Sequence, residues 1–188
     1  MRIAILGWGS LLWEDRPEFD KQHEAWRFDG PSFKVEFSRI SSSRQGALTL
    51  VIDNNNGSPT TVAWCLSKRQ SVEDAACDLR CREGTTIANI EVRVSKQHDP
   101  SAPQDPIIDW ARKRNLDAVI WTALESNFEK KIKKAFSVDA AVAYIKRLDT
   151  CGKAEAAEYI WRAPEFVHTC VRDALQREPW FSKDKPSV

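Results

Sequence analysis

The feature that most constrains the fold is a change of hydrophobic periodicity near residue 124. Before it, apolar residues alternate with polar ones, as in segment 32–39, where Phe33, Val35 and Phe37 fall on one face. A period of two predicts a half-exposed β-strand. After it, apolar residues recur at helical spacing in one stripe: Val138, Ala141, Val142, Ile145 and Leu148. A strand-rich part followed by a helical part predicts an α+β fold.

Turn residues and helix caps organise the strand-rich part. Segments 47–52 and 60–66 read as strands on either side of the Asp-Asn-Asn-Asn-Gly run at 53–57, whose residues tolerate the positive φ of tight turns. This pattern predicts a β-hairpin. Farther on, Ser71 and Asp74 have the spacing of a capping box, and Gly84 suits a left-handed C-terminal cap. A helix is therefore predicted from Ser71 to about Glu83.

The charge balance argues against nucleic-acid binding. Among 188 residues, 28 are Lys or Arg and 27 are Asp or Glu, so the formal net charge is +1. Nucleic-acid-binding domains usually carry a strongly basic face. One basic cluster alternates with apolar residues and reads as a solvated helix face, with polyanion binding as the less favoured alternative: Lys130, Lys131, Lys133 and Lys134. We expect no nucleic-acid partner.

The cysteine pattern favours free thiols in a reducing compartment. The chain has five cysteines and no CxxC pair, so a disulfide framework is not expected. Cys77 and Cys81 share a helix face but lack the further ligands of a structural zinc site, so no metal is predicted. A catalytic Cys81 paired with His98 or His168 is an alternative that the sequence leaves open.

Targeting signals are not evident in the sequence. The apolar segment 3–13 is followed by acidic residues rather than a cleavage site, so we interpret it as a buried strand and loop. No uncharged apolar run reaches the ~18 residues of a membrane span. Together with a hydrophobic content of 42%, these features predict a soluble cytoplasmic protein without a membrane partner.

A glycine-containing loop follows the first predicted strand. Its sequence, Gly7-Trp8-Gly9-Ser10-Leu11-Leu12, lacks the third glycine and the following helix of a dinucleotide site, and Ser10 does not stand in G-x-S-x-G. The glycines permit a tight turn whose backbone N–H groups suit a carboxylate or a developing oxyanion. An ordinary glycine turn is the alternative interpretation.

Glu83 is the second candidate, at the C-terminal end of the predicted helix. A carboxylate there faces the negative end of the helix dipole, whereas the neighbouring Arg82 is well placed. A locally unfavourable residue can indicate function. A solvated glutamate near a helix end is the simpler alternative.

Taken together, the two motifs resemble the γ-glutamylcyclotransferase family, especially its glutathione-degrading branch. The loop from Gly7 to Trp13 looks like the family's Y-G-S-L-x-W loop, with Trp8 in place of the tyrosine. The segment Leu79-Arg80-Cys81-Arg82-Glu83-Gly84 looks like the L-x-x-R-E-x-G segment that carries the catalytic Glu. The resemblance covers roughly residues 1–124. The indole of Trp8 keeps an aromatic wall and an N–H donor but accepts no hydrogen bond.

The resemblance implies a small mixed β-barrel with flanking helices, to which this chain adds a C-terminal helical extension. We expect residues 1–124 to form the γ-glutamylcyclotransferase-like domain, 125–181 a helical extension packed on it, and 182–188 a polar tail. The extension leaves three roles open: it narrows the pocket, forms a homodimer contact, or changes the substrate.

The implied reaction cyclises a γ-glutamyl group to 5-oxoproline and releases an amine, amino acid or peptide, without a cofactor. Glu83 is the expected catalytic acid/base, because the attacking α-ammonium must lose a proton that the leaving amine later regains. The expected substrate-binding residues are Gly7, Trp8, Gly9, Ser10 and Leu11. The alternative is a non-catalytic module on the same fold that binds a small metabolite or a protein.

Overall fold

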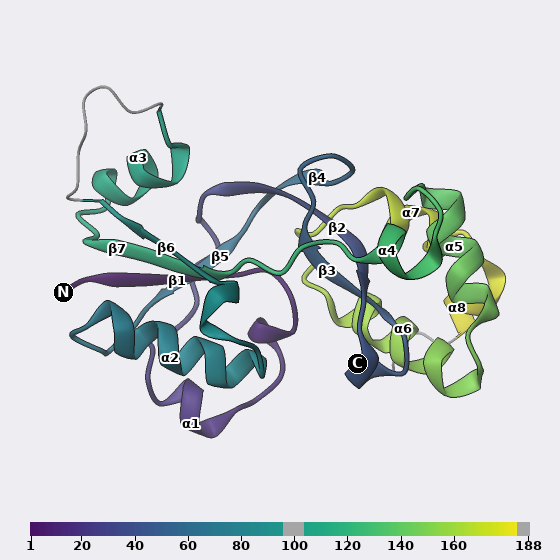
Figure 1. Cartoon of the computed structure of the whole chain (residues 1–188), viewed down its shortest axis with the longest axis horizontal. Coiled ribbons are helices and arrows are strands. Elements are labelled where there is room, and N and C mark those ends of the chain that lie inside the picture. Colours follow the sequence, from purple (N-terminus) through teal and green to yellow (C-terminus); the bar gives the residue numbers. More distant parts are fainter. Residues whose placement is uncertain (96–103, 184–188) are drawn as a thin grey trace. The chain divides into compact units, whose positions relative to one another are not determined.

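The computed structural model describes residues 1–95 and 104–183, which contain seven strands and eight α-helices (Figure 1). The α+β class predicted from the sequence is therefore confirmed. The chain divides into two compact units. The first unit consists of Met1–Gly7, Glu14–Ser32 and Thr61–Ala123, and the second of Trp8–Trp13, Phe33–Thr60 and Leu124–Val188. Segment 1–124, expected to be one domain, thus contributes to both units.

The first unit is built on a mixed four-stranded sheet in the order β5-β1-β7-β6. Its strands are β1 (Ile3–Gly7), β5 (Ala63–Leu66), β6 (Ile90–Val94) and β7 (Ala118–Thr122). Strand β1 pairs antiparallel with β5 and parallel with β7. All five residues of β1 are buried because the strand is central and covered on both faces.

Three helices accompany this sheet: α1 (Pro17–Asp20), α2 (Val72–Glu83) and α3 (Pro106–Lys113). Both α2 and α3 pack on β6 and β7. Figure 1 shows α1 and α2 on one side of the sheet and α3 on the other. Part of the predicted proline-rich loop at 99–106 lies outside the described residues.

The predicted helix after Ser71 is confirmed as α2, and its two ends are capped as expected. The Ser71 hydroxyl oxygen accepts a hydrogen bond from the Asp74 backbone N–H at 3.0 Å. Gly84 takes a left-handed conformation with φ +58°, which a residue with a Cβ adopts at a cost. Ala75, Ala76 and Leu79 form the buried stripe.

The second unit contains a three-stranded sheet in the order β3-β2-β4. The strands are β2 (Ser32–Ile40), β3 (Leu48–Ile52) and β4 (Ser58–Thr61). Five helices follow in sequence: α4 (Phe128–Ile132), α5 (Val138–Arg147), α6 (Thr150–Arg162), α7 (Cys170–Gln176) and α8 (Pro179–Lys183). Helix α6 packs on β3, and α5 packs on α6 and α7.

The predicted hairpin of segments 47–52 and 60–66 is wrong. The turn itself forms, since the Asp53 carboxylate accepts from the Asn56 backbone N–H and the Gly57 N–H donates to the Asp53 carbonyl. However, β3 and β4 each pair with β2, which lies between them, and the remaining strand β5 joins the first unit. Local turn chemistry determines where the chain reverses but not which strands become neighbours.

Strand β2 is also more buried than the sequence predicts. The alternation places Glu36 and Ser38 on an exposed face, but both are fully buried, as are Val35 and Phe37. The reason is that helical segments cover both faces of the strand. The Phe37 ring contacts Tyr159 of α6, and the Glu36 carboxylate contacts the backbone at the start of α7.

The strand pairings of the described residues form two sheets, and neither sheet closes on itself. The predicted β-barrel is therefore unconfirmed and stays a prediction. No helix within the described ranges is both long enough and apolar enough to cross a membrane. All five cysteines are free thiols.

Candidate functional site

Arg82, in the last turn of α2, is a buried basic residue of the first unit that contacts Glu14 and Glu83. Its side chain is only 4% exposed. Nη2 donates a hydrogen bond of 3.1 Å to the backbone carbonyl of Glu14 and lies 3.8 Å from the Glu14 carboxylate. Nη1 lies 3.7 Å from Oε1 of Glu83. Arg82 therefore contacts both Glu14 and Glu83, and all three residues belong to the first unit.

Arg82 places a positive charge beside the Glu83 carboxylate. Opposite charges about 4 Å apart attract each other, and partial burial strengthens the attraction. The Glu83 side chain is 21% exposed, so it is partly shielded from water but still reachable. The buried Arg82 needs such partners, because a desolvated guanidinium without hydrogen bonds or a counter-charge costs several kcal/mol.

The structure divides the predicted loop residues between the units. Gly7 ends β1 and pairs with Ala63 in the sheet, so it is a strand residue rather than part of a turn. Trp8 belongs to the second unit, is 6% exposed and has its ring centroid 5.7 Å from that of Phe33. Whether Glu83 and segment 8–11 line one pocket stays a prediction.

The rest of the loop forms one turn of 3₁₀-helix, from Ser10 to Leu12. The Leu12 N–H donates to the Gly9 carbonyl at 3.0 Å, and the Trp13 N–H donates to the Ser10 carbonyl at 3.2 Å. The loop therefore has a defined conformation within the second unit.

Gly9 is needed for a close approach rather than for a turn. Its φ is −121°, which residues with a Cβ also adopt. A Cβ built on Gly9 would lie 2.8 Å from the hydroxyl oxygen of Tyr159, closer than real Cβ contacts. The Tyr159 phenol of α6 thus occupies the space where a side chain at position 9 would stand.

Tyr159 is a residue that the sequence reasoning missed. It is 5% exposed, its ring contacts Trp13 and Phe37 in edge-to-face geometry, and the Arg44 guanidinium lies 4.8 Å from its centroid. A tyrosine within a helical stripe carries no motif, so nothing in the local sequence points to it. Its hydroxyl places a phenol beside Gly9 of the loop.

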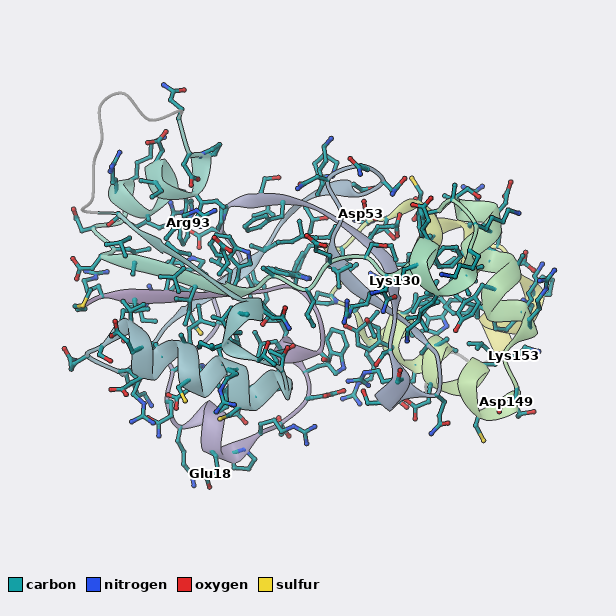
Figure 2. The ribbon with its side chains drawn as sticks, viewed as in Figure 1. Glu18, Asp53, Arg93, Lys130, Asp149 and Lys153 are labelled. Atoms are coloured by element: carbon teal, nitrogen blue, oxygen red, sulfur yellow. The ribbon has the colours of Figure 1, made fainter. Side chains whose placement is uncertain are left out.

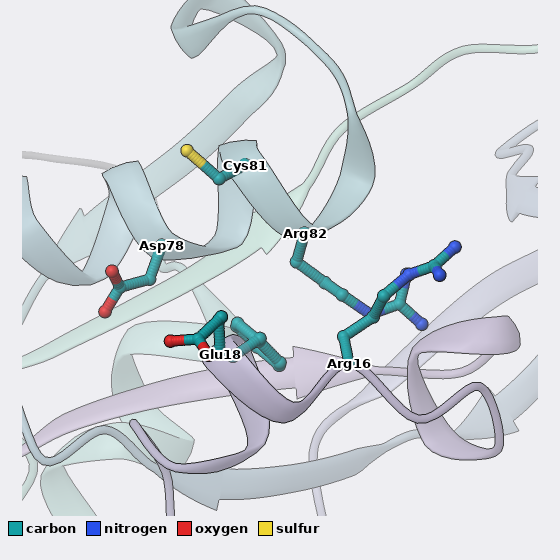
Figure 3. A pocket seen from close by; sticks show the side chains of 6 residues that line it. Arg16, Glu18, Asp78, Cys81 and Arg82 are labelled. Carbon is teal, nitrogen blue, oxygen red and sulfur yellow. The ribbon is translucent and has the colours of Figure 1, made fainter.

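A pocket of about 210 Å³ lies in the first unit between α1 and α2 (Figure 3). Its lining residues are Arg16, Glu18, Phe19, Asp78, Cys81 and Arg82. Figure 3 shows the two arginines together on one side of the pocket and Asp78 on the other. Asp78 is held by Arg69 through two hydrogen bonds of 2.7 and 3.0 Å. The lining therefore offers both cationic and anionic groups to a ligand.

Two buried charged side chains of the second unit have a structural explanation. Oxygens of Glu36 accept from the backbone N–H groups of Phe37 at 2.8 Å and Val171 at 3.4 Å, and burial raises the pKa of this carboxyl. Arg172 donates three hydrogen bonds of 2.8 Å to the carbonyls of Ala163, Pro164 and Val167. Together they fix the connection between α6 and α7.

All four lysines of the predicted solvated face are exposed, but the helix contains only Lys130 and Lys131. Helix α4, on which Lys130 is labelled in Figure 2, ends at Ile132 because Lys133 is left-handed with φ +58°. The Lys131 ammonium donates to the Ile40 carbonyl and the Ser42 hydroxyl. The four lysines therefore do not present one aligned row.

The alternative of a catalytic Cys81–histidine pair stays open. His98 lies outside the described residues, and Cys81 and His168 belong to different units. No protein-family model matches the chain, and no curated protein matches it. The resemblance to γ-glutamylcyclotransferases therefore depends on the two sequence motifs alone.

Proposed function

We propose that this protein is a γ-glutamylcyclotransferase-like enzyme that converts a γ-glutamyl group to 5-oxoproline and releases an amine, amino acid or peptide. The observation that carries the proposal is the position of Arg82. It contacts Glu83, the expected acid/base, and Glu14, the residue directly after the expected substrate loop. Arg82 thus belongs to one of the two motifs and contacts the residue that directly follows the other.

The reaction begins with proton removal. The Glu83 carboxylate takes a proton from the substrate α-ammonium, and the free amine attacks the γ-carbonyl carbon. A C–N bond forms and closes a five-membered ring. Because both reacting groups belong to one molecule, the enzyme needs mainly to hold a near-attack conformer.

The tetrahedral intermediate then collapses with cleavage of the original γ-amide C–N bond. The protonated Glu83 returns its proton to the leaving nitrogen, so no proton is gained or lost over the cycle. Gly7, Trp8, Gly9, Ser10 and Leu11 are the proposed substrate-binding residues, with backbone N–H groups of the loop stabilising the developing oxyanion. The family's β-barrel and the absence of a cofactor requirement are parts of the same proposal.

Glu83→Gln tests the proposal. An amide keeps the size of the side chain but takes no proton from the α-ammonium, so turnover should fall by about 10²–10⁴ while the substrate KM changes little. Release of 5-oxoproline is measured by chromatography from glutathione, γ-glutamyl amino acids and γ-glutamyl amines. Glu73→Gln is the matched control, because Glu73 is an exposed residue in the first turn of the same helix.

Two outcomes would contradict the proposal. If Glu83→Gln retains activity within a few-fold of wild type, Glu83 is only a helix-end residue. If wild-type protein releases no 5-oxoproline from any of the three substrate classes, a non-catalytic binding module becomes the better interpretation. In either case both variants should remain folded, which thermal unfolding monitors.

A further inference from the structure

Helix α2 carries two exposed thiols with a guanidinium between them. Cys77 and Cys81 are four residues apart and therefore lie on one face of the helix. Nη2 of Arg80 is 3.1 Å from the Cys81 sulfur and 3.7 Å from the Cys77 sulfur. The hydrogen bond to Cys77, together with the nearby charges of Cys81 and Cys77, raises the pKa of the Arg80 guanidinium.

This arrangement places a positive charge beside both sulfurs. The thiolate is the nucleophile of cysteine, and an adjacent arginine stabilises it. The other three cysteines provide contrasts. Cys65 is fully buried and desolvation raises its pKa, so its thiol is unreactive. Cys151 and Cys170 are exposed, but in the described part of the chain no guanidinium lies at hydrogen-bonding distance from either sulfur.

The pocket between α1 and α2 adjoins Cys81. Cys81 is one of its lining residues, and Arg16, Arg82, Glu18 and Asp78 place charges of both signs around it. Figure 3 shows Cys81 on the helix that forms one wall of the pocket. A ligand that carries both an ammonium and a carboxylate group, such as an amino acid, complements such a lining.

We propose that Cys81 is a site of reversible thiolation by low-molecular-weight disulfides of amino-acid thiols. The Cys81 thiolate attacks one sulfur of the disulfide, whose S–S bond breaks. A mixed disulfide with Cys81 forms, and the second half of the reagent leaves as a thiolate. The disulfide reagent is the oxidant. The half of the reagent that stays bonded to Cys81 places its amino-acid group in the pocket. The proposal does not depend on the cyclotransferase activity.

The mixed disulfide should accumulate rather than pass to Cys77. Cβ atoms of residues four apart on a helix are about 5–6 Å apart. A disulfide needs Cβ atoms at about 3.5–4.5 Å, so an internal Cys77–Cys81 bond would require the helix to distort. The expected product therefore contains one added half-reagent at Cys81.

The first experiment measures thiol reactivity residue by residue. The native protein is treated with iodoacetamide at neutral pH, and mass spectrometry follows alkylation of each cysteine over time. A guanidinium within about 4 Å attracts the negative charge of the attacking sulfur, and we expect it to raise the rate of Cys81 alkylation by about two- to threefold. Cys81 should react faster than Cys151 and Cys170, and Cys65 should not react.

Two variants separate charge from structure. Arg80→Gln should slow the alkylation of Cys81 by about two- to threefold, whereas Arg80→Lys, which keeps a positive charge, should retain most of the rate. The proposal is overturned if Cys81 reacts equally fast in wild type and Arg80→Gln. It is also overturned if Cys81 reacts no faster than Cys151 and Cys170. Thermal unfolding verifies that each variant is folded.

The second experiment tests the role of the pocket with three disulfides that contain no γ-glutamyl group. L-Cystine carries ammonium and carboxylate groups, cystamine only ammonium groups, and dithiodipropionate only carboxylates. The ratio of Cys81 to Cys151 modification should be highest with L-cystine. Arg16→Gln removes a 60% exposed pocket residue. It should lower this ratio without changing the iodoacetamide rate. Equal ratios for all three reagents would refute the pocket's part in the proposal.

Discussion

The contact of Gly9 with Tyr159 leads to a specific prediction for the loop that contains the proposed substrate-binding residues. Alanine at position 9 would place its Cβ 2.8 Å from the Tyr159 hydroxyl oxygen. Tyr159 has little freedom to move, because Trp13 and Phe37 contact its ring and the residue is 5% exposed. The Gly9→Ala variant must therefore displace the loop or strain the tyrosine.

The expected cost can be derived from the same geometry. Inserting a methyl group into a well-packed site typically costs about 1–3 kcal/mol. Tyr159→Phe removes the clashing oxygen, after which the nearest ring atom, Cζ, lies 4.0 Å from the added Cβ, an ordinary van der Waals distance. The double variant should therefore recover most of the loss, with a coupling energy of about 1–2 kcal/mol.

Urea unfolding followed by tryptophan fluorescence measures this cycle of four proteins. Gly84→Ala is the matched control. Gly84 has φ +58° and nothing within 4 Å, so alanine there should cost about 1 kcal/mol through its backbone alone. Tyr159→Phe should not rescue this variant. If Gly9→Ala is as stable as wild type, or if the effects of Gly9→Ala and Tyr159→Phe are additive, Tyr159 does not exclude a side chain at position 9.

Two further predictions concern the buried charges of the second unit. Arg172→Met should lower the free energy of unfolding by about 3 kcal/mol or more, because three carbonyls lose a charged donor. Arg177 is exposed, so Arg177→Met should change the free energy of unfolding by less than about 0.5 kcal/mol. If denaturant titrations give the same loss for both variants, the structural role of Arg172 is contradicted. Burial raises the pKa of Glu36 in the folded protein above its ordinary value of 4.5. Protonation of Glu36 therefore stabilises the folded state fully below pH 4.5, and this contribution is lost as pH rises through the folded-state pKa. The unfolding free energy of wild type minus that of Glu36→Gln should therefore fall as pH rises from 4.5, and a flat difference would contradict this.

The sequence alone determined the features that depend on near neighbours in the chain. The caps of α2 involve Ser71, Asp74 and Gly84, each of which acts within a few residues of its own helix end. The turn at 53–57 and the strand character of Ser32–Ile40 are local in the same sense. Propensity and capping act over one or two turns of the backbone, so a reader of the sequence can predict them.

The candidate site was only partly visible in the sequence. Glu83 and the Gly7–Leu11 loop are predicted from their motifs, whereas the sequence indicates Arg82 only as a well-placed charge. Its contact with Glu14 required the fold, because the two residues meet only when α2 packs beside α1. The charge pattern around Cys81 likewise depends on side chains contributed by both helices.

Tertiary structure alone decided which strands pair, which polar groups are buried and which side chains meet. Strand β2 lies between β3 and β4 although the turn at 53–57 reads as a hairpin, and the start of α7 contacts Glu36 on the face of β2 that alternation assigned to solvent. Gly9 became a contact site only because α6 brings the Tyr159 hydroxyl to it. The physical reason is common to all three: each depends on burial between segments far apart in the chain, whose free energy no local pattern encodes.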